Sequence, residues 1–83
     1  MTEIKILVRD DCPLCDEAEQ VVDRVVGDED DDGYEVVTEN IEGTPALEEL
    51  YGDEVPVVMI DGVAKFRLYL DEDELRDALG LQN

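Results

Sequence analysis

The stretch that decides the fold is Cys12-Pro13-Leu14-Cys15, which contains the only two cysteines of the chain. An apolar run at residues 4–8 precedes it and predicts a strand that is buried on most of both faces. Apolar residues then recur at helical spacing, which predicts a helix over residues 13–26 that ends at Gly27. Pro13 suits the first helical turn, where its missing N–H costs nothing. The chain therefore places two thiols at a strand-to-helix junction, where they can close into a disulfide.

The rest of the chain predicts an alternation of strands and helices. Thr44-Pro45 is typical of a helix start, and Asp61-Gly62 is typical of a two-residue hairpin turn. The predicted elements are a strand over 34–39, a short helix over 45–51, strands over 55–60 and 63–67, and a last helix over 72–79. The order β-α-β-(short α)-β-β-α indicates an α/β fold with helices packed on a four-stranded mixed sheet. We expect residues 1–83 to form a single domain, because a chain of this length has no room for two cores.

The short helix and the last helix each have an expected buried face. Asp71 is a candidate N-cap of the last helix, and Glu74 three residues later completes a capping box. Gly52 and Gly80 mark the expected C-terminal ends of the two helices. The residues expected to be buried are Leu47, Leu50, Leu75, Ala78 and Leu79.

The charge of the chain is strongly negative, with 25 acidic residues, 6 basic ones and a net charge of −19. Such a chain is either disordered or a folded protein adapted to molar salt, which screens the repulsion. The periodic Val, Ile and Leu segments favour the folded alternative, and the composition resembles that of proteins from halophilic archaea. The charge argues against nucleic acid and anionic membranes as partners.

The acidic run from Gly27 to Gly33 suggests a calcium-binding loop at first sight. It lacks the mid-loop glycine and the terminal bidentate glutamate that an EF-hand requires. We therefore interpret it as a solvated loop.

The N-terminal residues lack the features of a signal peptide, and no apolar run approaches the roughly 20 residues of a membrane span. We therefore expect a cytoplasmic protein, and a monomer. In a reducing cytosol, a close cysteine pair is more often catalytic or metal-binding than a permanent structural link.

The dithiol has two unequal members in this interpretation. Cys12 lies at the helix N-terminus, where free N–H groups and the helix dipole stabilise a thiolate. Cys15 lies one turn further on and is expected to be more covered. We therefore predict that Cys12 attacks a substrate disulfide and that Cys15 resolves the mixed disulfide.

Four carboxylates oppose this activation of the thiol. Asp10, Asp11, Asp16 and Glu17 surround the cysteines in sequence, and their field disfavours a thiolate. Salt screens exposed carboxylates but not N–H groups in direct contact. Cys12 is therefore predicted to become a better nucleophile as salt rises.

These residues resemble those of a glutaredoxin-like protein of the thioredoxin fold. The resemblance rests on the Cys-Pro-x-Cys motif with Cys12, Pro13 and Cys15, on Pro56 at the start of a later strand, and on Arg9 three residues before the first cysteine. It implies a thiol-disulfide oxidoreductase with no bound cofactor and no metal, whose substrate is a disulfide-containing protein or a small thiol. The electron donor would be a small thiol, glutathione or another, or a reductase.

The resemblance also implies a substrate site formed by Arg9, Pro13, Val55 and Pro56. It implies a cis bond between Val55 and Pro56, with the backbone of Val55 pairing with the substrate near Cys12. An ordinary surface role remains the alternative for Arg9.

Two departures leave the use of glutathione open. The segment over 66–71 lacks the Gly-Gly pair that glutathione-using members carry before the last helix, although Asp71 and Asp73 supply acids there. Leu14 also stands where the family commonly has an aromatic residue. Arg67 and Tyr69 are candidates for lining the cleft, with packing or surface roles as the alternative.

Two other functions remain open. The cysteine pair could belong to a metal or iron–sulfur carrier, but zinc prefers four ligands and the chain has two cysteines and no histidine. The protein could also be a non-catalytic interaction domain whose acidic surface is the working part.

Overall fold

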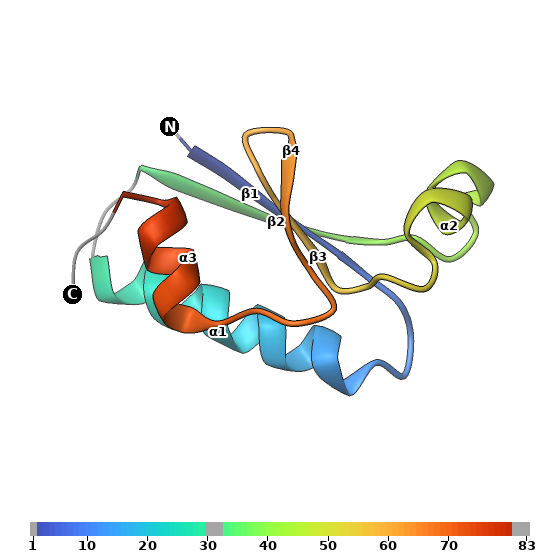
Figure 1. Ribbon diagram of the computed structural model, residues 1–83, viewed down its shortest axis with the longest axis horizontal. Helices are drawn as coiled ribbons and strands as arrows, with labels where there is room; N and C mark the ends of the chain where they lie inside the picture. Colours follow the sequence, from blue (N-terminus) through green and yellow to red (C-terminus); the bar gives the residue numbers. More distant parts are fainter. Residues whose placement is uncertain (1, 30–32, 81–83) are drawn as a thin grey trace.

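The computed structural model describes residues 2–29 and 33–80. For residues 28 and 29 it describes the backbone only. Within these residues the elements are β1 (Thr2–Val8), α1 (Pro13–Glu29), β2 (Tyr34–Asn40), α2 (Pro45–Tyr51), β3 (Val57–Ile60), β4 (Val63–Arg67) and α3 (Glu72–Ala78), as Figure 1 shows. The predicted α/β fold with a four-stranded mixed sheet is confirmed. Residues 30–32 of the expected solvated loop lie outside the described residues.

The sheet has the order β2-β1-β3-β4. β1 pairs in parallel with β2, and β3 pairs antiparallel with both β1 and β4. The central position of β1 explains its nearly continuous apolar sequence, because both its faces are covered over most of their length. Asp61 and Gly62 both have positive φ, which matches the two-residue hairpin turn expected between β3 and β4.

The main core lies between the sheet and two helices. Figure 1 shows α1 and α3 side by side along one face of the sheet. Alternate residues of the central strands point into this face, and α1 contributes one side chain per turn. The buried members of the core are Ile4, Ile6, Val8, Cys15, Ala18, Val22, Val25, Val58, Ile60, Leu70 and Leu75.

A second, smaller core lies on the other face of the sheet, toward α2. Its buried members are Leu7, Ile41 and Val57, and Leu47 and Tyr51 of α2 pack against them. In Figure 1, α2 stands at the opposite end of the molecule from α3. The two cores thus explain why both the even-numbered and the odd-numbered residues of β1 are apolar at its C-terminal end.

The prediction that the first helix ends at Gly27 is wrong, since α1 continues to Glu29. Gly27 does not adopt the positive φ of a terminating glycine, and open space surrounds the position of its absent Cβ. A glycine with helical backbone angles weakens a helix but does not end it. Hence Gly27 is an interior residue of α1.

Two residues expected on the buried faces of α2 and α3 are exposed. Leu50 on α2 has 64% of its surface accessible, and Ala78 on α3 is also exposed. Both helices are seven residues long; α2 has no buried residue and α3 buries Leu75 alone, so the remaining positions expected to be buried are partly or fully exposed. Leu75 is fully buried, as expected, and Leu47 and Leu79 are partly buried.

The helix starts follow their sequence signals. The Asp71 carboxylate accepts hydrogen bonds from the N–H groups of Asp73 and Glu74, which confirms the cap of α3. Pro45 occupies the first turn of α2 as expected, but the Thr44 side chain makes no capping hydrogen bond. No helix in residues 2–29 or 33–80 is long and apolar enough to cross a membrane.

Candidate active site at the start of α1

The cysteine pair lies at the junction between the end of β1 and the start of α1. Residues 9–12 turn the chain, and Asp11 adopts a positive φ of 53° within that turn. The Cys12 carbonyl accepts the Asp16 N–H at 3.1 Å, so Cys12 occupies the N-cap position and Pro13 the first helical position. Cys12 is therefore the residue at the positive end of the helix dipole.

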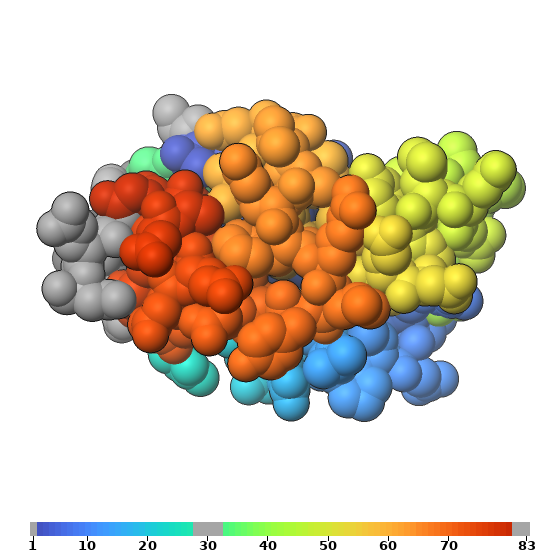
Figure 2. Space-filling model, in the orientation of Figure 1, coloured from blue at the N-terminus to red at the C-terminus, as the bar shows by residue number. Residues whose placement is uncertain are grey.

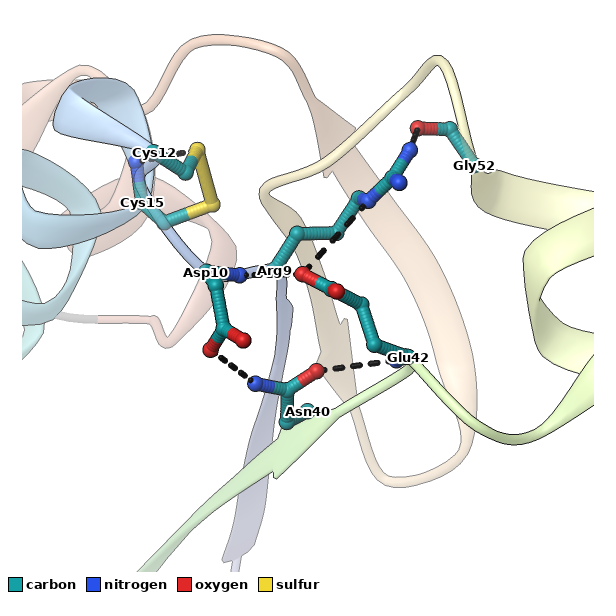
Figure 3. Close-up of a disulfide and its surroundings, with 7 residues drawn as sticks. All are labelled: Arg9, Asp10, Cys12, Cys15, Asn40, Glu42 and Gly52. Atoms are coloured by element: carbon teal, nitrogen blue, oxygen red, sulfur yellow. Dashed lines mark hydrogen bonds and ion pairs between the residues drawn. A yellow bond between two sulfur atoms is a disulfide. The ribbon is translucent and has the colours of Figure 1, made fainter.

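Cys12 and Cys15 are joined by a disulfide, with their Cα atoms 5.2 Å apart. The Cys15 N–H donates a hydrogen bond to the Cys12 Sγ at 3.1 Å (Figure 3). This N–H belongs to the first helical turn and has no carbonyl partner within the helix. If the same contact persists after reduction, it stabilises negative charge on the Cys12 sulfur.

Burial distinguishes the two sulfur-bearing residues. Cys15 is 1% exposed and belongs to the main core, together with Val8 and Leu70. Cys12 is partly exposed and packs against the edge of the same core. An incoming disulfide can therefore reach Cys12 more easily than Cys15.

A hydrogen-bond network holds the turn before Cys12, as Figure 3 shows. The Asp10 N–H donates to the Glu42 carboxylate at 2.7 Å, and the Asn40 amide donates to the Asp10 carboxylate at 2.8 Å. The Glu42 N–H in turn donates to the Asn40 side-chain oxygen at 2.8 Å. This network ties the cysteine-bearing turn to the C-terminal end of β2.

Neither Asn40 nor Glu42 was expected at the site from the sequence. The available signal was topological, because β1 and β2 form a parallel pair. Parallel neighbours place their carboxyl ends at the same edge of a sheet. Polar residues after the second strand therefore meet the turn that follows the first.

The structure does not bring the Arg9 guanidinium to the disulfide. Arg9 donates to the Gly52 carbonyl at 3.1 Å, and its Nε lies 4.0 Å from the Glu42 carboxylate. In Figure 3 its side chain points toward Gly52 and away from the sulfur atoms. The predicted contact of Arg9 with substrate remains a prediction.

The Val55–Pro56 bond is cis. Pro56 is buried and lies immediately before Val57, so β3 begins two residues later than the expected start at Val55. Val55 is partly buried and packs against the main core. This core contains Cys15, and Cys12 also packs against it. Val55 also packs against the second core, so it lies between the two cores, while Pro13 is exposed in the first turn of α1.

Charge around the site is mostly negative. The four acidic residues that surround the cysteines in the sequence are all exposed: Asp10, Asp11, Asp16 and Glu17.

Among residues 2–29 and 33–80, no group of three or more histidine, cysteine or acidic side chains is placed to hold a metal ion.

Solved structures similar to this chain share its fold. The structural genomics target protein XcR50 from X. campestris is 27% identical, with a TM-score of 0.77, over 93% of this chain and 95% of that chain. Protein Ne2328 from Nitrosomonas europaea is 26% identical, with a TM-score of 0.75, over 98% of this chain and 92% of that chain. A mutant thioredoxin from Halobacterium salinarum is 26% identical, with a TM-score of 0.65, over 93% of this chain and 70% of that chain.

The likeness to thioredoxin matches the fold expected from the sequence. A search among curated proteins finds no match. This fold, together with an adjacent cysteine pair that closes into a disulfide, supports a role like that of a thiol oxidoreductase. The family model described as Glutaredoxin-like domain (DUF836) matches residues 3–80, and the chain therefore belongs to the glutaredoxin-like domain family.

Proposed function

We propose that this protein is a thiol-disulfide oxidoreductase that works through a dithiol mechanism, with Cys12 as nucleophile and Cys15 as resolving thiol. The observation that carries the proposal is the asymmetry of the pair. Cys12 is partly exposed and its Sγ accepts a hydrogen bond from the Cys15 N–H at 3.1 Å, whereas Cys15 is buried one turn further along α1. A thiolate is the attacking species in disulfide exchange, and the N-cap position favours it at Cys12.

The reaction transfers two electrons in two exchange steps. The Cys12 thiolate attacks one sulfur of the substrate disulfide, whose S–S bond breaks, and the released sulfur takes up a proton. The Cys15 thiol then loses its proton and attacks the Cys12 sulfur. The mixed disulfide breaks, the second substrate sulfur is released as a thiol, and the Cys12–Cys15 disulfide forms. An external thiol or dithiol, or a reductase, returns the pair to the reduced state.

The test uses reduced protein and bis(2-hydroxyethyl) disulfide, followed by mass spectrometry. The wild-type protein is expected to end as the internal disulfide with two molecules of 2-mercaptoethanol released. Cys15→Ser is expected to stop at the mixed disulfide on Cys12. Cys12→Ser is expected to react far more slowly, because its remaining thiol is buried.

Two outcomes would overturn parts of the proposal. If Cys12→Ser forms a mixed disulfide as fast as Cys15→Ser, the assignment of the nucleophile is wrong. If the wild-type protein reacts no faster than a short unstructured peptide with the same four-residue motif, the fold contributes nothing to the exchange and the enzymatic function is wrong.

A further inference from the structure

The turn before Cys12 is held by hydrogen bonds that involve no atom of either cysteine. The Glu42 carboxylate accepts the Asp10 N–H at 2.7 Å, and the Asn40 amide donates to the Asp10 carboxylate at 2.8 Å. The Glu42 N–H donates to the Asn40 side-chain oxygen at 2.8 Å, which links the two residues to each other. Opening the disulfide therefore breaks none of these bonds.

The residue between this network and Cys12 has a backbone conformation that needs support. Asp11 has a φ of 53°, in the left-handed region that costs free energy for residues other than glycine. The bonds of Asp10 fix the chain on one side of Asp11, and the Cys12 carbonyl, which accepts the Asp16 N–H at 3.1 Å, fixes it on the other. Loss of the bonds of Asp10 would let the turn relax, and Cys12 would move with it.

Arg9 connects the network to the end of α2. Its Nε lies 4.0 Å from the Glu42 oxygen that accepts the Asp10 N–H, and its guanidinium donates to the Gly52 carbonyl at 3.1 Å. Gly52 caps the C-terminal end of α2, where carbonyl groups lack partners within the helix. Figure 2 shows the blue residues at the start of α1 beside the yellow residues at the end of α2. The cysteine-bearing turn is thus tied to both β2 and α2.

The position of Cys12 matters most once the disulfide is open. In the disulfide form the covalent bond itself keeps the Cys12 Sγ near the Cys15 N–H, at 3.1 Å. After reduction, only the backbone position and side-chain rotamer of Cys12 determine this distance. An N–H group at a helix N-terminus stabilises a thiolate through close contact. The conformation of the turn therefore sets how well the reduced protein stabilises the Cys12 thiolate.

We propose that Asn40 and Glu42 are positioning residues of the dithiol, which keep Cys12 at the N-terminus of α1 after the disulfide opens and so hold its sulfur against the Cys15 N–H. This inference rests on the proposed function, because it concerns the residue assigned there as nucleophile. Both residues act through the backbone of the turn rather than through contact with the substrate. The attacking thiolate is thus prepared by the fold before the substrate arrives.

The charged groups of this region separate positioning from a simple field effect. Those of the turn, of the start of α1 and of the residue after β2 are Arg9, Asp10, Asp11, Asp16, Glu17 and Glu42. Beside Val55, Glu54 pairs with Arg67 at 3.3 Å. Most of these groups are carboxylates, whose field disfavours a thiolate. Removal of a carboxylate that acts only through its field would therefore favour the thiolate, whereas removal of a positioning carboxylate would disfavour it.

The test measures the rate of iodoacetamide alkylation against pH in Cys15→Ser, whose single thiol is Cys12, in about 1 M KCl to screen remote charges. The midpoint of the profile reports the stabilisation of the thiolate, and the plateau at high pH reports access to the sulfur. Asn40→Ala, added to Cys15→Ser, changes no charge and removes the amide group of the network. It is expected to raise the midpoint by about 0.5–1 unit and to change the plateau by less than about twofold.

Two variants at position 42, in the same Cys15→Ser protein, separate the hydrogen-bond acceptor from the charge. Glu42→Ala removes both and is expected to raise the midpoint by about 0.5–1 unit. Glu42→Gln keeps an acceptor oxygen for the Asp10 N–H and is expected to leave the midpoint at or below that of Cys15→Ser alone. Glu17→Ala is the matched control, because it makes the same substitution at an exposed carboxylate of α1. It is also expected to leave the midpoint at or below that of Cys15→Ser alone.

The same loss is expected in the exchange reaction of the protein with both cysteines. At a pH below the midpoints, Asn40→Ala is expected to reduce bis(2-hydroxyethyl) disulfide about two- to threefold more slowly than the wild-type protein. The effect is smaller than the loss of thiolate, because a less acidic thiol gives a more nucleophilic thiolate.

The possible failures are distinct. Unchanged midpoints in Asn40→Ala and Glu42→Ala, in protein that circular dichroism shows to be folded, would overturn the inference and leave the proposed function intact. A midpoint that falls in Glu42→Ala would also overturn it, because Glu42 would then act only through its charge. An equal rise in Glu42→Gln and Glu42→Ala would overturn the role of the acceptor oxygen. Failure of the wild-type protein to reduce bis(2-hydroxyethyl) disulfide would overturn the proposed function itself.

Discussion

At the scale of single residues, the position of Cys12 brings two opposing electrostatic effects together. The Cys15 N–H lies 3.1 Å from the Cys12 Sγ and favours a thiolate there. The carboxylates of Asp10, Asp11 and Asp16 are exposed nearby and disfavour it. Salt separates the two effects, since it screens charges that interact through water but not an N–H in direct contact.

The first prediction follows from this separation. In Cys15→Ser, whose single thiol is Cys12, the rate of alkylation by iodoacetamide is expected to rise about three- to tenfold from low salt to about 1 M KCl. N-acetylcysteine in the same series is the control for any effect of salt on the reagent. A rate that is flat or falls with salt, in protein shown to remain folded, would contradict the prediction.

At the scale of elements, α1 extends beyond its expected end because nothing at Gly27 stops it. Gly27 and Gly80 both have open space around the position of a Cβ, but only Gly80 has a positive φ, of 78°. Both were expected to terminate helices. The two glycines therefore form a matched pair that differs in backbone conformation and not in available space.

The second prediction uses this pair. Gly27→Ala is expected to raise the free energy of unfolding by about 0.5–1 kcal/mol, because alanine restricts the unfolded chain and suits a helix interior. Gly80→Ala is expected to lower it by about 1 kcal/mol, because alanine at positive φ is strained. Urea unfolding at fixed salt measures both. A loss of stability in Gly27→Ala as large as that in Gly80→Ala would mean that the helix ends at Gly27.

The contact between α1 and α3 includes one ionic cluster. The Glu72 carboxylate of α3 accepts from Arg24 of α1 at 2.8 Å and from Arg76 at 3.2 Å. Its hydrogen bond with Arg24 foremost, and then that with Arg76, lowers the pKa of Glu72 below the ordinary value of 4.5. The folded protein therefore releases the Glu72 proton more readily than the unfolded chain does.

The third prediction is the pH dependence of this cluster. A lowered folded-state pKa contributes stability that is fully present above the unfolded pKa and is lost as the pH falls through the folded pKa. The wild-type protein is therefore expected to be more stable than Glu72→Gln at pH 7, with a difference that closes in the acid range below 4.5. Urea unfolding at a series of pH values measures the difference. Glu74→Gln, an exposed acid in the same helical turn, is the control, and a Glu72→Gln difference that is constant with pH would argue against the role of the ion pairs.

At the scale of the whole molecule, the net charge of −19 over 83 residues opposes the compact state. In the described residues, ion pairs join α1 to α3 and β1 to β2, and another lies within α3. With 6 basic residues against 25 acidic ones, the chain cannot give every carboxylate a basic partner. Most carboxylates therefore face solvent and one another. Their repulsion depends on ionic strength, because the Debye length falls from about 10 Å at 0.1 M to about 3 Å at 1 M salt.

The fourth prediction is a steep dependence of thermal stability on salt. The Tm is expected to rise by about 10 °C or more between about 0.1 and 1 M KCl, since 1 kcal/mol corresponds to about 4–8 °C in a protein of this size. Circular dichroism measures the Tm. A variant with Asp23→Asn, Glu35→Gln and Glu49→Gln, all exposed positions, is expected to depend less on salt. An equal dependence in the variant would point to the general effect of salt on apolar burial instead.

The sequence by itself determined the order of the elements, the place of the dithiol at a helix N-terminus, the hairpin turn at Asp61 and the cap at Asp71. These features depend on hydrogen bonds and apolar periodicity within a few residues, so local sequence contains the information. Only the tertiary structure decided the exposure of Leu50, the direction of Arg9, the network around Glu42 and the positive φ of Leu68. The contacts of Arg9, Glu42 and Leu68 join segments that lie far apart in the sequence, and the exposure of Leu50 depends on how the rest of the chain packs around α2. The dithiol could therefore be predicted from its motif, whereas the hydrogen-bond network that holds the turn before it required the folded chain.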